Sequence, residues 1–114
     1  MFPLNDHTRG YFNAHRLSKM KKDAILINAT RGEAVDQDAL YTALKEGVIA
    51  AAGLDVTTPE PLPTDSPLFS LPNCTIFPHI GSATVATREK MALMAAENIV
   101  AVATGKPIPF QAKL

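Results

Sequence analysis

The stretch AILINATRG, residues 24–32, decides the fold class of this 114-residue chain. It opens with a short apolar run that follows a charged cluster and ends at Asn28. Such a run is typical of a strand buried on both faces, as in a parallel sheet. Polar residues begin directly afterwards, at Thr30 and Arg31. The stretch therefore predicts a buried parallel strand over residues 24–28 that ends at a possible ligand-binding edge.

Helical patterns lie on both sides of this strand. Residues 13–21 predict a short helix with Asn13 as its N-cap. After the strand, Asp36 can cap a second helix, which Gly47 ends in the usual position. The apolar stripe of that second helix consists of Ala39, Leu40, Ala43 and Leu44.

The pattern alternates again in the second half of the chain. Residues 49–56 and 74–78 predict two more strands, separated by a segment, 57–73, that contains five prolines. Prolines at this density predict a long, stiffened loop without a regular element. A long helix follows over 82–104, and its apolar residues occupy much of its circumference, so we expect it to be covered on more than one side. Ser82 or Thr84 can cap this helix, and Gly105 and Pro107 stop it.

Alternating strands and helices indicate an α/β protein with a parallel sheet. Three strands make a very small sheet with an exposed edge. We therefore predict the C-terminal half of a Rossmann-like, doubly wound sheet, followed by a long C-terminal helix.

Composition excludes several classes of function. Apolar residues make up 46% of the chain and the formal net charge is +0, which fits a globular protein and argues against nucleic-acid and membrane-surface partners. No apolar run approaches the ~20 residues of a membrane span, and the start has no signal-peptide pattern. The single cysteine, Cys74, cannot form an internal disulfide; we predict a buried, inert thiol in a reducing, cytoplasmic setting. No metal site is predicted.

Charged side chains follow each of the three predicted strands. Arg31 follows the first, Asp55 and then Glu60 follow the second, and His79 follows the third. Because the carboxyl ends of parallel strands meet at one edge, we expect these four side chains to cluster there.

Such a cluster fits the interconversion of a carbonyl and an alcohol. His79 suits the proton step, because the ordinary histidine pKa lies near working pH. A carboxylate such as Glu60 would favour the charged imidazole and fix its tautomer. Arg31 could hold a substrate carboxylate through two hydrogen bonds.

Each residue also has a purely structural interpretation. Arg31 could cap a carbonyl or pair with Glu33, Asp55 could cap a turn, Glu60 could be solvated between its prolines, and a lone histidine at a strand end is more often structural. The shared placement favours a site, whereas His7 and His15 receive no role.

The quoted motifs resemble one family. The order INATRG (27–32), GLDV (53–56), PEP (59–61) and PHIGS (78–82) is similar to that of the D-isomer-specific 2-hydroxyacid dehydrogenases, and the resemblance covers nearly the whole chain. The wording GLDVTTPEPLP and LPNCTIFPHIGSAT is similar to the branch that reduces glyoxylate and hydroxypyruvate to glycolate and D-glycerate with NADH or NADPH.

The resemblance implies roles for individual residues. Arg31 would bind the carboxylate and carbonyl of a small 2-oxo or 2-hydroxy acid, with His79 as acid/base and Glu60 as its partner. Asp55 would contact the nicotinamide carboxamide. Ala29, Thr30, His79 and Gly81 would line the nicotinamide end, and Ser82 would lie beside the substrate.

The sequence departs from the family in one major respect: it contains no Gly-x-Gly-x-x-Gly loop for the pyrophosphate. We therefore expect residues 1–104 to be the C-terminal part of an NAD(P)-binding domain. Residues 105–114 would be a tail of the substrate domain, to which the long helix would cross. The parent enzyme would be a homodimer, and this chain alone a truncated, inactive product. The alternative is a non-enzymatic interaction module or isoform built on the same half-domain.

Overall fold

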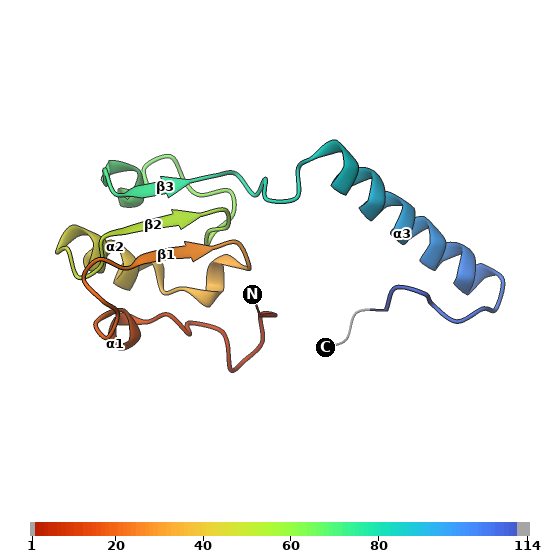
Figure 1. The fold of residues 1–114 in the computed structure, drawn as a ribbon, viewed down its shortest axis with the longest axis horizontal. Helices are drawn as coiled ribbons and strands as arrows, with labels where there is room; N and C mark the ends of the chain where they lie inside the picture. The colour runs from red at the N-terminus through yellow and green to blue at the C-terminus, as the bar shows by residue number, and fades with distance from the viewer. Residues whose placement is uncertain (1, 112–114) are drawn as a thin grey trace. The chain divides into compact units, whose positions relative to one another are not determined.

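The computed structural model describes residues 2–111. Three strands form one sheet in sequence order: β1 (Ile25–Asn28), β2 (Ala51–Leu54) and β3 (Cys74–Ile76) (Figure 1). Both pairings are parallel. The ends of β1 and β2 pair as Asn28 with Leu54, and Leu54 pairs in turn with Ile76. The predicted parallel sheet is confirmed, and the carboxyl ends of all three strands meet at one edge.

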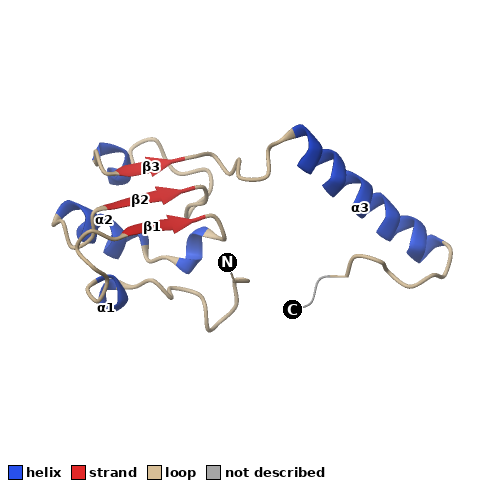
Figure 2. Cartoon of the chain, in the orientation of Figure 1, coloured by secondary structure: helices blue, strands red, loops and turns tan. Residues whose placement is uncertain are grey.

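The chain divides into two compact units at the Ile80–Gly81 junction. The first unit holds the sheet with α1 (Ala14–Leu17), η1 (Gly32–Ala34), α2 (Gln37–Lys45) and η2 (Pro67–Ser70). The second unit holds α3 (Val85–Ala103) and the segment after it. Figure 2 shows these elements by type.

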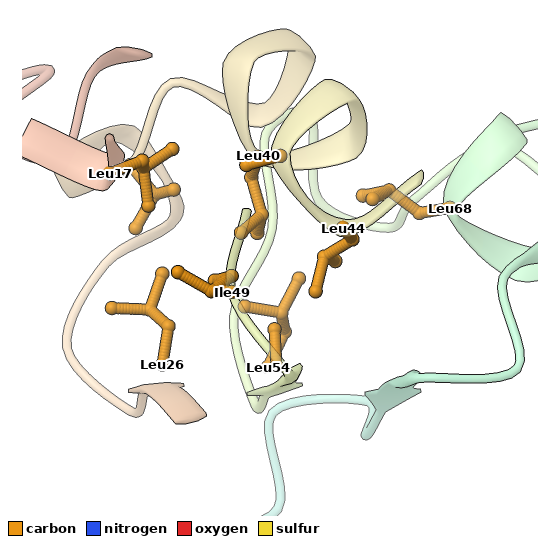
Figure 3. Close-up of a cluster of buried hydrophobic side chains, with 10 residues drawn as sticks. Leu17, Leu26, Leu40, Leu44, Ile49, Leu54 and Leu68 are labelled. Carbon is orange, nitrogen blue, oxygen red and sulfur yellow. The ribbon is translucent and has the colours of Figure 1, made fainter. Parts of the chain in front are cut away.

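The core of the first unit lies between one face of the sheet and the helices (Figure 3). Leu26 and Leu54 project from the sheet, and Leu40 and Leu44 project from α2 toward them. All four are at most 5% exposed. Leu17, Ile49 and Leu68 complete the same cluster. Burial of these side chains stabilises the unit by roughly 1.5–3 kcal/mol for each large residue.

Helix α2 forms as its sequence predicts. The Asp36 carboxylate accepts a hydrogen bond from the Ala39 N–H at 3.0 Å and so caps the first turn. Gly47 ends the helix with φ of +68°, where a left-handed residue is needed. Three of the four predicted apolar residues, Leu40, Ala43 and Leu44, are buried.

Two local predictions are wrong. The helix predicted over 13–21 is a single turn, α1, although Asn13 caps it as expected. Its last part is replaced by turns, since the Ser18 hydroxyl donates to the His15 carbonyl at 2.9 Å and competes with helical bonding. The proline-rich loop contains η2, whose Pro67 stands at the start of the turn, where a missing N–H costs little.

The strands are shorter than predicted, and β1 is buried on one face only. Ile25 and Ile27 are 61% and 69% exposed, whereas Leu26 and Asn28 are buried. The apolar side chains of Ile25 and Ile27 are suited to burial. Within residues 2–80, however, the helices pack on the opposite face of the sheet, which carries Leu26 (Figure 1). The prediction of a strand buried on both faces is therefore wrong for this unit.

Helix α3 begins at Val85 with Thr84, one of the two predicted residues, as its N-cap. Gly105 ends it with φ of +66°. Apolar side chains remain exposed along the helix, among them Val85, Leu93, Ile99 and Val102, so the described residues of the second unit do not provide the expected cover. The side-chain amide of Asn98, within the helix, exchanges two hydrogen bonds of 3.0 Å with the backbone of Phe110 in the segment that follows.

Two further findings concern the described residues. None of their helices is both long and apolar enough to cross a membrane. Cys74, predicted as buried, is only partly buried, because β3 is the edge strand of the sheet. The burial that it has raises the pKa of its thiol, which disfavours the reactive thiolate.

Candidate functional site

Asp55 lies at the centre of the carboxyl edge. Its N–H donates to the Asn28 carbonyl at 2.9 Å, and its carbonyl accepts the N–H of His79 at 2.9 Å. The residue thereby connects the end of β1 to the segment that follows β3. The edge that the sequence predicts as a meeting point is held together by backbone hydrogen bonds.

His79 has an unusual backbone conformation. Its φ is +54°, in the left-handed region that residues other than glycine rarely adopt. The two sides of this residue are held by Asp55, since the Ile80 N–H donates to Asp55 Oδ1 at 2.8 Å. A costly conformation that neighbours hold in place is a feature of functional sites.

The imidazole of His79 bonds directly to Glu60. His79 Nδ1 and Glu60 Oε1 are 2.5 Å apart. Because an ionised carboxylate can only accept a hydrogen bond, Nδ1 carries the hydrogen, and Nε2 is the nitrogen that points away from Glu60. The Glu60 loop is anchored by Thr57, which is only 6% exposed. The Thr57 hydroxyl donates to the Pro59 carbonyl at 3.0 Å, and its N–H approaches Glu60 Oε2 at 3.4 Å. The peptide bonds before Pro59 and Pro61 are both cis.

The electrostatics of the site favour an ionised Glu60. The hydrogen bond from His79 is the main cause that lowers the pKa of Glu60, and partial burial opposes it. The Thr57 N–H and the charges of His79 and Arg31 lower this pKa further.

Arg31 is presented by a turn that Asn28 builds. The buried Asn28 amide donates to the Arg31 carbonyl at 2.8 Å and accepts from the N–H and hydroxyl of Thr30 at 3.1 and 2.8 Å. Arg31 Nη1 donates to the Thr30 carbonyl at 2.7 Å, so the structural interpretation as a carbonyl contact is partly correct. This bond uses one of the five guanidinium N–H donors. Glu33 pairs instead with Arg9, at 3.8 Å.

Two hollows open at this edge. A cavity of about 520 Å³ is lined by Asp55, Glu60 and His79 together with apolar side chains that include Phe69 and Phe77. A second hollow of about 530 Å³ is lined by Ala29, Thr30 and Arg31 and by residues 2–4. Two of the predicted site residues, Gly81 and Ser82, belong to the second unit of the chain.

The sequence motifs assign no role to three residues of this region. Thr57 anchors the Glu60 loop, and Gln37 and Gly32 contact that loop from the segment after Arg31. A glycine directly after Arg31 and a buried threonine after a strand are weak signals, and nothing local marks Gln37. Among the described residues, no group of three or more histidine, cysteine or acidic side chains could hold a metal ion.

The family model for the D-isomer specific 2-hydroxyacid dehydrogenase, NAD binding domain, matches residues 1–81. The chain belongs to this family. The assignment made from the four motifs is therefore confirmed. The match is to the cofactor-binding domain, which agrees with the parallel sheet of the first unit.

A curated relative shows the likeness at finer scale. The human protein "Glyoxylate reductase/hydroxypyruvate reductase" is 55% identical over 111 residues, which are 97% of this chain and 34% of the human protein. The chain thus spans about a third of the length of the relatives it matches.

Two solved structures share the fold. A D-isomer specific 2-hydroxyacid dehydrogenase from Xanthobacter autotrophicus Py2, in complex with NADPH and MES, is 42% identical with a TM-score of 0.82 over 99% of this chain and 46% of its own. D-lactate dehydrogenase with NAD+ from Lactobacillus jensenii is 33% identical with a TM-score of 0.86 over 100% of this chain and 38% of its own. Structural neighbours of this family therefore bind either nucleotide.

Proposed function

We propose that this chain supplies the acid/base and substrate-anchoring part of the active site of an NAD(P)H-dependent 2-oxo acid reductase. The observation that carries the proposal is the short bond between His79 Nδ1 and Glu60 Oε1, with the Arg31 charge nearby. A histidine oriented by a carboxylate beside a guanidinium matches what carbonyl reduction needs.

The proposed substrates are glyoxylate and hydroxypyruvate, reduced to glycolate and D-glycerate. The 55% identity to the human reductase of that name supports this choice over other 2-oxo acids. Both substrates combine a carboxylate with a neighbouring carbonyl, so one cationic group can bind the acid while a proton donor serves the carbonyl oxygen.

The residues of this chain would divide the work as follows. Arg31 binds the substrate carboxylate and polarises the carbonyl, which fixes the reacting group at the edge of the sheet. His79 Nε2 gives its proton to the carbonyl oxygen as that oxygen becomes a hydroxyl. Glu60 holds Nδ1 protonated, so that Nε2 is the proton-exchanging nitrogen. Ser82 would add a polar contact to the substrate.

The residues present fit one end of the cofactor. Ala29 and Thr30 border the hollow beside Arg31 at the carboxyl edge, where nucleotides bind in such sheets. Ala29, Thr30, Asp55, His79 and Gly81 would hold the nicotinamide end. When bound, NADH or NADPH would supply the hydride. The sequence has no glycine loop for the pyrophosphate, so the remaining contacts must come from outside residues 1–114.

The wider setting is part of the same proposal. Residues 1–104 would belong to the cofactor domain and residues 105–114 to the substrate domain, with α3 crossing between them. The working enzyme would be a homodimer in the cytoplasm. A single cysteine, which cannot form an internal disulfide, fits a reducing compartment.

A chimera tests the proposal directly. Residues 1–111 of this chain would replace the matching segment of the human relative, which restores the glycine loop and the substrate domain. We expect hydroxypyruvate-dependent oxidation of NADPH or NADH. His79→Ala in the chimera should lower kcat by ~10²-fold or more, because general acid catalysis is worth about that much.

His7→Ala is the matched control, since His7 is an exposed histidine that lines neither of the two hollows. It should leave kcat unchanged. A chimera that binds cofactor but keeps its full kcat after His79→Ala would show that another group donates the proton, and the proposal would fail.

A further inference from the structure

Gln37, the first residue of α2, makes an unusual contact with the loop that carries Glu60. Its Oε1 accepts the N–H of Thr58 at 2.9 Å, and its Nε2 donates to the carbonyl of the same residue. One side-chain amide therefore satisfies both backbone groups of Thr58, as a neighbouring strand would. The two residues are 21 positions apart in sequence.

A second contact joins the same two segments. Gly32 is buried against the backbone of Thr57, and a Cβ at position 32 would overlap the carbonyl carbon and oxygen of Thr57. Since backbone atoms cannot yield as a flexible side chain can, the close approach requires glycine here. The turn after Arg31 thus packs directly on the strand-to-loop junction before Glu60.

We infer that Gln37 is a positioning residue for the Glu60–His79 pair, holding the loop that carries Glu60 in register with the turn that carries Arg31. The inference rests on the proposed function and deepens it. Residues 31–37 form one short segment. It begins with Arg31, the proposed substrate anchor, and ends with Gln37, which bonds to Thr58 in the loop that carries Glu60. The spacing between the substrate anchor and the proton donor is then set by the contact of Gln37 with Thr58, and not by the proline-rich loop alone.

The contacts of Glu60 explain why the bond between Gln37 and Thr58 matters. Glu60 is exposed, and among the described residues its side chain bonds to His79 and, at 3.4 Å, to the Thr57 N–H. A carboxylate on an exposed loop keeps a 2.5 Å contact only if its backbone is held. Thr57 holds the loop from within, and Gln37 holds it from the neighbouring segment.

The test uses the whole chain, labelled for NMR, with Gln37→Ala and its neighbour Asp38→Ala as the matched control. Asp38 lies in the same first turn and is exposed, and it makes no side-chain hydrogen bond in the described structure. Three quantities are measured: exchange of the Thr58 amide, titration of the Glu60 carboxyl carbon, and the ring-nitrogen signals of His79. His79→Ala gives the Glu60 titration without its partner.

We expect Gln37→Ala to speed exchange at Thr58 by roughly three- to tenfold, the loss of one ordinary hydrogen bond. The pKa of Glu60 should rise toward its ordinary value of 4.5, as we also expect in His79→Ala, and His79 should lose its single-tautomer signal. Asp38→Ala should change none of these. Gln37→Glu, which keeps the acceptor but not the donor, should fall between the wild type and Gln37→Ala.

Two outcomes separate the inference from the proposed function. If Thr58 exchange rises in Gln37→Ala while the Glu60 titration and the ring-nitrogen signals of His79 stay as in the wild type, Gln37 only stabilises the loop and the inference is overturned. If His79→Ala itself leaves the Glu60 titration unchanged, the acid/base pair does not exist in solution and the proposed function fails. In the chimera, Gln37→Ala should lower kcat and shift its pH profile; unchanged kinetics would also overturn the inference.

Discussion

Glu60 and His79 link the chemistry of the site to the stability of the fold. Their bond lowers the pKa of Glu60 in the folded chain, whereas the unfolded chain has the ordinary value of about 4.5. A carboxyl group with a depressed folded-state pKa stabilises the fold above the unfolded pKa. That contribution disappears as pH falls through the folded-state value.

We therefore predict that Glu60→Gln destabilises the chain at neutral pH but not at strongly acidic pH. Urea unfolding from pH 7 down to pH 3 should show the two stabilities beginning to converge below about pH 4.5, where the unfolded carboxyl gains its proton, and meeting only below the lowered folded-state pKa. Asp65→Asn, an exposed carboxylate of the same loop, is the control and should differ little from the wild type at any pH. A wild-type advantage that persists undiminished in acid would contradict the assigned ionic contact.

At the scale of elements, α2 is the structural support of the site. It covers the sheet with Leu40 and Leu44, and its first turn holds the Glu60 loop through Gln37. The helix has only nine residues, so the hydrogen bonds at its two ends make a large contribution to its stability.

Loss of the N-cap should therefore be measurable. Asp36→Ala removes the acceptor of the Ala39 N–H and should destabilise the chain by ~0.5–2 kcal/mol in urea unfolding. Asp36→Asn keeps a capping oxygen and should retain most of the stability. Equal losses in both variants would indicate that the charge, rather than the cap, is what matters.

Elements with local signals were predictable from the sequence. The N-caps of all three α-helices and the glycines that end α2 and α3 act through contacts within a few residues, and they appear where expected. The turn at Ser18 was missed because a hydroxyl bonded to a nearby carbonyl resembles any helical serine in the sequence. The 3-10 turn at Pro67 was missed because proline density says nothing about where a turn starts.

The sequence predicted where candidate side chains lie, but not the contacts that support them. Because strand ends in a parallel sheet share an edge, the pattern placed Asp55, Glu60 and His79 together, as the structure does. Their roles in the site, and that of Arg31, stay predictions. The grip of Gln37 on Thr58 and the packing of Gly32 on Thr57 join segments more than 20 residues apart. No periodicity or spacing encodes such contacts. The open face of β1 was missed for a related reason. An apolar run indicates that its side chains are suited to burial, but it does not show which segment packs on them.

At the scale of the whole molecule, two surfaces remain apolar and exposed. In the first unit, Ile25 and Ile27 stand on the sheet face opposite α2. In the second, α3 exposes apolar side chains along its length. Apolar patches of this kind favour association, so we expect the chain by itself to self-associate as concentration rises.

The last prediction concerns activity of residues 1–114 alone. We expect no turnover and weak binding of NADH and NADPH, because the sequence offers only the residues proposed for the nicotinamide side and contains no glycine loop for the pyrophosphate. Hydrogen bonds to charged groups contribute about 1.5–3 kcal/mol each, so the loss of two costs roughly 10²-fold or more in affinity.

Calorimetry with each nucleotide and a hydroxypyruvate-dependent oxidation assay measure this, with the chimera as the positive control. Ile25→Thr with Ile27→Thr should reduce association without restoring activity, because the defect lies in missing cofactor contacts rather than in aggregation. Micromolar affinity with turnover in a monodisperse sample would show instead that the contacts at the carboxyl edge suffice to hold the cofactor.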